Sequence, residues 1–491
     1  MRYYRPDVFG GLVILRRILL LFAACAVILG AASSDPGCLA ACEPVATDSP
    51  RTLVLALDGV PLRLVVQAKE QGAYAGFEPP QPMISTFPSV TNVAFTAILS
   101  PFGVDHAGGY EVSFFDLEQN KVVGSNPFGY QDRLFAWRDA FDVTSRTIGS
   151  KFKTYTRPKK VSLDAVTKAE DVLYDEPSKE LVLAHIGAAD ALMHLRGDKA
   201  MLQLLMELDG RIQEIKERHL ATFGRPLRVV MLSDHGNSAI KIHRAKGIKK
   251  ALRKADLEVV KGLSDKHGQV VAPTFGIVGY GALFMHEEDA ETASRAVVEN
   301  PRVDLAAWLS SPTEMFVIAD VGAAVVHWRQ KLDGGWKLSY VPVDGDPLAY
   351  ESVLDRLQIS GRLDRDGFAD EDDWFLETAS SEYPDGLRRL IYSLTGTYVD
   401  NYATVVFSLK PGFAWGWTSA HLSSKLSGGR LEGTHGGLDY DSTVGFFMTD
   451  DPAYQPATAV RAEQALAPFA GMNDCLIVAD DEAEHEDGHG H

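Results

Sequence analysis

The sequence is 491 residues long and carries 48 basic and 66 acidic residues, which gives a formal net charge of −18. This acidity excludes sequence-independent binding to nucleic-acid polymers, because such binding requires clustered lysine and arginine side chains. Four cysteines in this length exclude a disulfide-based scaffold and a cysteine-rich zinc module. The sequence has a single long apolar run, which excludes a multi-pass membrane protein.

Basic residues precede this uncharged, mostly apolar run, which covers Ile18–Ser34. The pattern predicts a signal peptide or lipoprotein signal at residues 1–32, followed by a small, polar, proline-containing linker at 33–50. Cys25 and Cys42 each end a lipobox-like stretch, so simple cleavage, a lipid anchor and an uncleaved anchor helix all remain open. Each alternative predicts an extracytoplasmic protein (periplasmic, secreted or lipid-anchored) that contacts a membrane only through a retained N-terminal anchor.

Three continuous apolar runs have the character of buried strands, and each leads into polar residues. The runs are Thr52–Leu57, Leu181–Ile186 and Leu227–Leu232, and the polar residues that follow them are Asp58, then Asp190, then Asp234 with His235. Between the second and third runs, Gly197–His219 has apolar residues at near-helical spacing. Strand, helix and strand in this order predict an α/β fold with a mostly parallel central sheet flanked by helices. Ligands bind such sheets at the carboxyl ends of the strands, where these acids and histidines fall.

The pattern changes at about residue 246, where short β-like runs alternate with acidic and glycine-containing turns. We interpret 246–400 as an inserted α+β cap that holds the substrate region, which makes 51–245 and 401–479 two parts of one catalytic core. Strand-like segments at 403–409 and 443–448 support the return to the core. The remaining segment, 480–491, is acidic and contains histidines, and its composition predicts a disordered tail.

The polar residues at the predicted strand ends are carboxylates and imidazoles without thiolates, a set that zinc binds well and manganese tolerates. Asp190 and His194 are four residues apart, so a helical turn places them on one side. His435 lies between glycines, which allow the backbone to approach a ligand closely. Thr91 opens an apolar segment of helical character, and a hydroxyl at a helix N-terminus lies where an anion such as phosphate is stabilised.

These motifs, in this order, resemble the alkaline phosphatase superfamily, specifically its type I phosphodiesterase/nucleotide pyrophosphatase branch. The resemblance covers roughly 51–245 and 400–450, and it implies an alkaline-phosphatase-like core with a site for two divalent metal ions. By that resemblance one metal is held by Asp58, Asp234 and His235 with Thr91 bound to it, and the other by Asp190, His194 and His435. It also implies a hydrolase that cleaves phosphate diesters or monoesters through a phospho-threonine at Thr91.

The sequence departs from this branch at two places. Asn92-Val93-Ala94-Phe95 follows Thr91 where the branch has Phe-Pro-Asn-His, and Glu111 stands near the position of an asparagine that clamps a phosphoryl oxygen. We take Asn92 and Glu111 as candidate substrate contacts. A carboxylate at Glu111 argues against a nucleotide and is compatible with a cationic head group or an extra metal. The candidate substrates are therefore a small phosphate ester or a phospholipid head group.

Several related activities remain open at this stage. A phosphomonoesterase or a phosphonate hydrolase would use the same residues, and so would a phosphotransferase that passes a head group to an alcohol at the cell envelope. A catalytically silent relative that only binds is the remaining alternative. His185, inside a predicted strand, is interpreted as a core histidine and not as a ligand.

Overall fold

The computed structural model describes residues 49–124, 135–144, 154, 156–274, 276–332, 334–416 and 431–472. The chain divides into two compact units, residues 1–46 and 47–491, and every described residue belongs to the second. The signal at 1–32, nearly all of the 33–50 linker and the 480–491 tail lie outside the described residues, so these assignments stay predictions. No helix in the described ranges is both long enough and apolar enough to cross a membrane.

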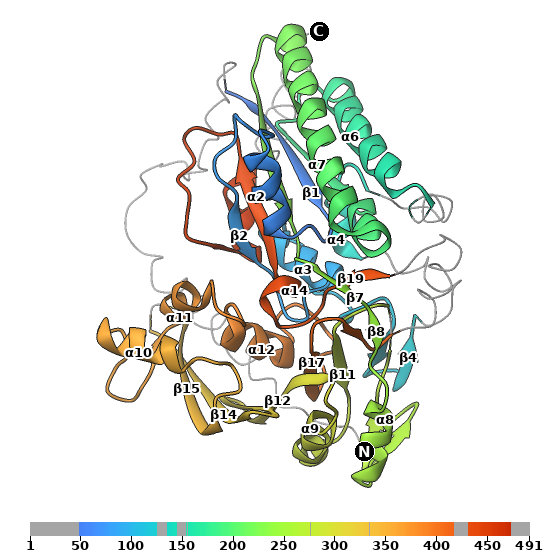
Figure 1. The fold of residues 1–491 in the computed structure, drawn as a ribbon, viewed down its shortest axis with the longest axis vertical. Coiled ribbons are helices and arrows are strands. Elements are labelled where there is room, and N and C mark those ends of the chain that lie inside the picture. The colour runs from blue at the N-terminus through green and yellow to red at the C-terminus, as the bar shows by residue number, and fades with distance from the viewer. Residues whose placement is uncertain are drawn as a thin grey trace, which may run out of the picture. The chain divides into compact units, whose positions relative to one another are not determined.

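Within the described residues, six strands form a central, mostly parallel sheet (Figure 1). In sheet order they are β21 (Val460–Arg461), β2 (Gln81–Ile84), β20 (Val444–Thr449), β6 (Leu227–Ser233), β1 (Arg51–Leu57) and β5 (Leu181–Ile186). β1 pairs in parallel with both β5 and β6, whereas β20 runs antiparallel to its neighbours β2 and β6. The three strands predicted from their apolar runs thus lie side by side, and the predicted α/β class with a mostly parallel sheet is confirmed.

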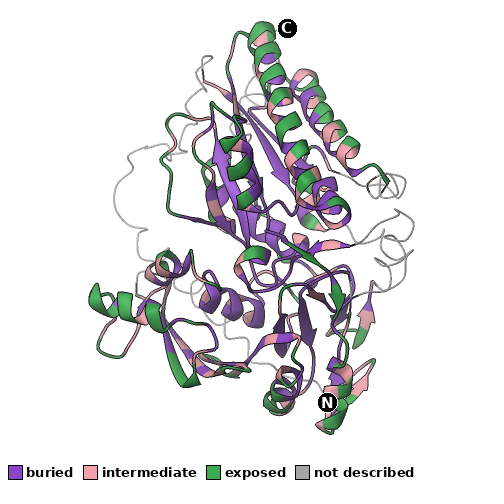
Figure 2. Cartoon of the chain, viewed as in Figure 1, coloured by how far each residue is buried: buried purple, intermediate pink, exposed green. Residues whose placement is uncertain are grey.

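Helices cover both faces of this sheet, which explains why β1 is a continuous apolar run and not an alternating one. Leu53, Leu55 and Leu57 enter one core, and Val54 and Ala56 enter another on the opposite face. The first core is closed by α2 (Leu62–Glu70), α6 (Pro158–Asp175) and α7 (Ala188–Phe223), and the second by α3 (Thr91–Ile98), α4 (Ala136–Asp139) and α15 (Ala462–Ala465). Figure 2 shows the strands buried, while the helices expose their outer sides.

A second sheet is antiparallel throughout and, in the described part of the chain, has seven strands. In sheet order they are β11 (Tyr280–Leu283), β17 (Val405–Leu409), β12 (Val303–Ser311), β13 (Glu314–Ala319), β14 (Gly322–Gln330), β15 (Trp336–Gly345) and β16 (Ala369–Asp370). Its helices are α8 (Ile248–Lys254), α9 (Ala290–Val298), α10 (Glu351–Ile359), α11 (Glu371–Thr378) and α12 (Gly386–Thr395). The strand expected at 403–409 therefore forms as β17, but it joins this sheet and not the central one, so a boundary at residue 400 does not separate the two sheets.

Short elements complete the described chain. The small strand pairs are β3 with β4 (Phe114–Asp116, Lys121–Val123), β7 with β19 (Ser238–Lys241, Glu432–Thr434), β8 with β18 (His243–Arg244, Phe413–Ala414) and β9 with β10 (Glu258–Val260, Gln269–Val271). The helix α14 (Tyr440–Thr443) and 3₁₀ turns at Ser100–Phe102, Glu287–Asp289 and Ala467–Phe469 lie between larger elements. The pairing of β19 with β7 matters most, because it brings the chain before His435 beside the chain after His235.

Candidate functional site

The first cluster of functional side chains lies at the carboxyl ends of β1 and β6. Asp58 directly follows β1, and Asp234 and His235 directly follow β6. Because β1 and β6 are parallel neighbours, their ends meet at one edge of the sheet. The Asp58 Oδ1 atom is 3.5 Å from His235 Nε2, and the Asp234 Oδ2 atom is 3.4 Å from the same nitrogen. Asp58, Asp234 and His235 thus offer ligand atoms that all lie within 4.8 Å of one another.

The second cluster lies beside the first and comes from α7 and the segment after β19. Asp190 and His194 stand in the first turns of α7, ahead of a break at Gly197, and Asp190 Oδ1 is 3.2 Å from His194 Nε2. His435 reaches the same carboxylate, with its Nε2 atom 3.7 Å from Asp190 Oδ1. Among the described residues, these two clusters are the groups of acids and histidines that are close enough to hold a metal ion.

Gly59 separates the two clusters. The rings of His235 and His435 stack with centroids 4.0 Å apart, which places the clusters side by side. A Cβ added at Gly59 would lie 2.8 Å from Asp190 Oδ1 and 3.3 Å from His235 Cε1. The backbone at Gly59 has a φ of +68°, which also favours glycine. Both the space and the conformation therefore require glycine after Asp58.

The three histidines are oriented by backbone carbonyls. The Nδ1 atom of His194 is 2.8 Å from Gly433 O, that of His235 is 2.9 Å from Gly236 O, and that of His435 is 3.0 Å from Ser89 O. A carbonyl only accepts, so each Nδ1 carries the proton and donates. Burial, helped by the neighbouring His235, lowers the pKa of His435 to about 3, so its ring is neutral and its Nε2 lone pair faces Asp190. Imidazoles fixed in this way are the usual ligands of bound metals.

Two carboxylate oxygens of the site have no hydrogen-bond partner among the described residues: Asp234 Oδ2 and Asp190 Oδ1. Asp234 is fully buried, and burial raises its pKa well above the ordinary value, with the charges of Asp58 and Asp190 adding to the effect. Burial also acts to raise the pKa of Asp190, but the imidazoles led by His194 outweigh it and hold that pKa below its ordinary value. A bound cation would satisfy the two carboxylate oxygens that have no hydrogen-bond partner, and the neighbouring imidazoles are suitable ligands for it, so these residues fit divalent metal ions.

Thr91 is the first residue of α3, as expected, and its side chain joins the first cluster. Its Oγ1 atom donates to Asp58 Oδ1 at 3.1 Å and lies 3.5 Å from His235 Nε2. The free N–H groups and dipole at the start of α3 favour an anion at this position. A hydroxyl, a helix N-terminus and two acid–histidine clusters therefore converge on one edge of the central sheet.

The two expected substrate contacts lie in different environments. Both polar groups of the Asn92 amide are used inside the protein, since Nδ2 donates to Gly109 O at 2.6 Å and Oδ1 accepts from Trp137 Nε1 at 3.1 Å. These two bonds tie Asn92 to the scaffold, and its contact with substrate stays a prediction. Glu111 is half-buried and lines a pocket with Tyr280 and Trp415. Burial raises the pKa of Glu111 to about 8, and the charges of Asp190 and Asp58 add to the rise.

His185, interpreted from sequence as a core histidine, is buried but also contacts the site. Its Nε2 atom is 3.3 Å from Asp58 Oδ2, and its Nδ1 atom is 3.2 Å from Thr144 Oγ1. With the Thr144 hydroxyl donating to Nδ1, Nε2 donates to Asp58 and fixes that carboxylate. The available signal was a histidine near the end of an otherwise apolar strand, paired in register with Ala56 on β1.

Comparison with known proteins gives a distant structural similarity. No protein-family model and no curated protein sequence matches the chain. Among solved structures, it is similar to murine ectonucleotide pyrophosphatase/phosphodiesterase 5, with a TM-score of 0.45, 12% identity, and coverage of 86% of this chain and 95% of that one. The human protein of the same name gives a TM-score of 0.43 at 12% identity, covering 86% and 94%. An inactive murine variant in complex with AMP gives 0.43 at 11% identity, covering 87% and 95%.

Proposed function

We propose that this chain is a metal-dependent hydrolase of phosphate esters, with diesters as its first substrate class, which acts outside the cytoplasm. The observation that supports it most is the convergence of Thr91 Oγ1 with two acid–histidine clusters at a helix N-terminus. The proposed extracytoplasmic location rests on the signal predicted at residues 1–32. In this proposal Asp58, Asp234 and His235 hold one divalent ion, and Asp190, His194 and His435 hold the other; zinc suits the ligand types best and manganese is compatible.

Each group of the chain has a defined task in the proposed reaction. Thr91 Oγ1 attacks phosphorus, while its proton is directed at Asp58 Oδ1, which accepts the hydrogen bond. His185 and the Gly59 N–H hold the acids, through Asp58 Oδ2 and Asp234 Oδ1 respectively. Bound divalent ions would supply a lower pKa for the attacking hydroxyl and would offset charge on the phosphoryl oxygens. The N-terminus of α3 stabilises the same charge.

The proposed reaction proceeds in two displacements. First, a bond forms between Thr91 Oγ1 and phosphorus as the bond to the leaving oxygen breaks, and the leaving alcohol takes up a proton. Water then attacks phosphorus, the bond to Thr91 Oγ1 breaks, and the threonine hydroxyl regains its proton. Splitting the reaction in this way is the usual advantage of a covalent nucleophile.

Glu111 favours diesters over monoesters in this proposal. Its carboxyl group lies close enough to Asp190 and Asp58 for their charges to raise its pKa, so it belongs to the same electrostatic site. A diester carries one negative charge and a monoester about two at neutral pH. Because the pKa of Glu111 is about 8, its carboxyl group is ionised mainly above that pH, and there it repels a monoester more strongly than a diester.

The test uses zinc-loaded protein with bis-p-nitrophenyl phosphate and mono-p-nitrophenyl phosphate. Thr91→Ala should lower kcat on the diester by at least about 10³-fold, because it removes the nucleophile. Thr96→Ala is the matched control: its hydroxyl is buried on the same helix and bonds only Asn92 O among the described residues, so turnover should persist. Unchanged turnover in Thr91→Ala would refute the nucleophile. Faster cleavage of the monoester than of the diester would refute the substrate class.

A further inference from the structure

Arg389 is a fully buried arginine on α12, and its guanidinium bonds two segments that are distant from it in sequence. One is the Thr91 loop (85–90), where its Nη2 donates to Thr86 O and to Ser89 Oγ, both at 2.9 Å. The other is the His435 loop (435–443), where Nη1 donates to Leu438 O at 3.2 Å and Nη2 to Thr443 Oγ1 at 2.8 Å. A single rigid fork thus connects the chain before Thr91 to the chain after His435.

Ser89 extends this connection to the site itself. Its hydroxyl, which accepts from Arg389, lies 3.0 Å from Gly437 O and donates to it, and its backbone carbonyl accepts the Nδ1–H of His435. Thr91 follows Ser89 by two residues and opens α3. The orientation of His435 and the position of the Thr91 hydroxyl therefore depend on a segment in which the Thr86 carbonyl and the Ser89 hydroxyl accept hydrogen bonds from Arg389.

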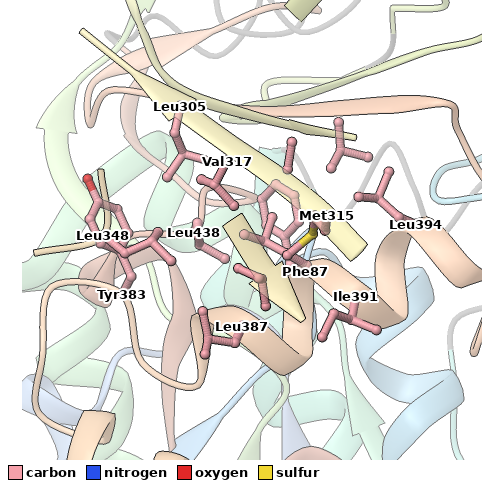
Figure 3. Packing of buried hydrophobic residues seen from close by; sticks show 14 of the residues in the cluster. Phe87, Leu305, Met315, Val317, Leu348, Tyr383, Leu387, Ile391, Leu394 and Leu438 are labelled. Carbon is pink, nitrogen blue, oxygen red and sulfur yellow. The ribbon is translucent and has the colours of Figure 1, made fainter. Parts of the chain in front are cut away.

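Apolar packing holds α12 against the same two loops. Phe87 from the Thr91 loop and Leu438 from the His435 loop belong to one buried cluster with Leu387, Ile391 and Leu394 of α12 (Figure 3). Arg389 reaches the polar atoms of those loops from the same helix. α12 thus fixes apolar side chains through its leucines and isoleucine, and carbonyl and hydroxyl oxygens through one cation.

The acceptors of Arg389 are neutral carbonyl and hydroxyl oxygens, which makes a purely stabilising role a poor explanation. Burial lowers the pKa of Arg389 to about 10, opposed by the charge of Asp385, so the group stays cationic at neutral pH. Burying a cation against neutral acceptors is unfavourable compared with an apolar side chain of similar volume. The planar guanidinium, in contrast, has a fixed geometry that suits it to bonding several acceptors at once.

We propose that Arg389 is a positioning residue, which holds the Thr91 loop and the His435 loop in the relative placement that directs Thr91 and His435 at the same phosphate. The phosphate in this inference rests on the proposed function. The connection between the two loops rests on the geometry of the hydrogen bonds alone. Arg389 would then contribute to the site from α12, a helix of the region around the second sheet.

The test compares Arg389→Met with Arg388→Met in the full chain. Arg388, the preceding residue, is paired with Glu371 and Glu463 and forms no hydrogen bond or ion pair with either loop among the described residues, so its variant controls for lost stability on α12. With both variants folded by circular dichroism, Arg389→Met should lower kcat on bis-p-nitrophenyl phosphate about 10²-fold with little change in KM. It should also weaken zinc binding about 10–100-fold at one of two sites, measured by chelator competition. Arg388→Met should change neither quantity.

A second readout depends on the guanidinium itself. In Arg389→Ala, added guanidinium chloride at a non-denaturing concentration should restore part of kcat, whereas it should not raise kcat in Arg388→Ala. Wild-type kcat and zinc affinity in folded Arg389→Met would overturn the positioning role while leaving the proposed function intact. A wild-type protein that binds zinc without turnover would refute the proposed hydrolase, and the zinc comparison would still decide the role of Arg389. A wild-type protein that neither binds zinc nor turns over would refute both.

Discussion

Asp234→Asn should have opposite effects on the metal-free and the metal-loaded protein. Asp234 is fully buried; its Oδ1 accepts from Gly59 N at 3.0 Å, and its Oδ2 has no hydrogen-bond partner in the described chain. The asparagine keeps the first bond and removes the charge. Metal-free protein should therefore become more stable, while a ligand of the proposed metal site is lost.

The magnitude follows from the one unpaired oxygen. A buried polar atom without a partner costs about 1–3 kcal/mol, and more when it is charged, so we expect the variant to gain at least about 1 kcal/mol without metal at pH 8. Burial raises the pKa of Asp234, so the folded state keeps a proton that the unfolded chain releases above its ordinary pKa of roughly 4. The free energy of unfolding of the wild type therefore falls as pH rises above roughly 4. The stability that Asp234→Asn gains over the wild type should grow with pH and vanish in acid.

The assay is urea unfolding of chelator-treated protein at several pH values, repeated with excess zinc. Zinc at 1,000 times its Kd should stabilise the wild type by about 4 kcal/mol, and the variant by much less. Asp439→Asn is the matched control, because Asp439 is also buried with an unpaired Oδ2 and its Oδ1 accepts from Ser442 N. Asp439→Asn should still be stabilised by zinc as much as the wild type is. A less stable metal-free Asp234→Asn at pH 8, or a full zinc effect in it, would refute the reasoning.

Two further substitutions test the surroundings of the site. Gly59→Ala should abolish stabilisation by zinc, since its Cβ would lie 2.8 Å from Asp190 Oδ1. The control is Gly72→Ala, because Gly72 also has a positive φ, +96°, but has open space around it. This control should lose stability yet keep zinc binding in the same titration. Glu111→Gln should stabilise metal-free protein against urea at pH 8 and have little effect at pH 5. Burial raises the pKa of Glu111 from 4.5 to about 8, so its contribution to stability is lost as pH rises between these values, by at most about 1.4 kcal/mol per pH unit. A Glu111→Gln gain that does not change with pH would contradict this account.

The three neighbouring parallel strands of the central sheet were predictable because they are buried on both faces. β1, β5 and β6 are continuous apolar runs that end in polar residues, and parallel pairing brings those ends together. Local sequence therefore placed Asp58 and Asp234 at one edge. β17 was predictable as a strand, but the sheet that it joins was not, since a buried apolar strand carries no local signal for its neighbours.

Long-range contacts account for the rest of what sequence could not show. Arg389 and Ser89 are 300 residues apart and meet only because α12 packs on the Thr91 loop. His185 was interpreted as core because it lies within a strand, and nothing in that strand reveals that Asp58 follows the neighbouring one. The position of Asn92 after Thr91 likewise gives no sign that both ends of its amide bond to Gly109 and Trp137.

The most direct test of the central claim is to trap the covalent intermediate. Zinc-loaded protein mixed with bis-p-nitrophenyl phosphate, quenched in acid within one turnover and digested, should give a peptide that carries p-nitrophenyl phosphate on Thr91. The modification should be missing from Thr91→Ala and from chelator-treated protein. Turnover of the wild type with the modification on another residue, or with none at any quench time under single-turnover conditions, would contradict Thr91 as the nucleophile.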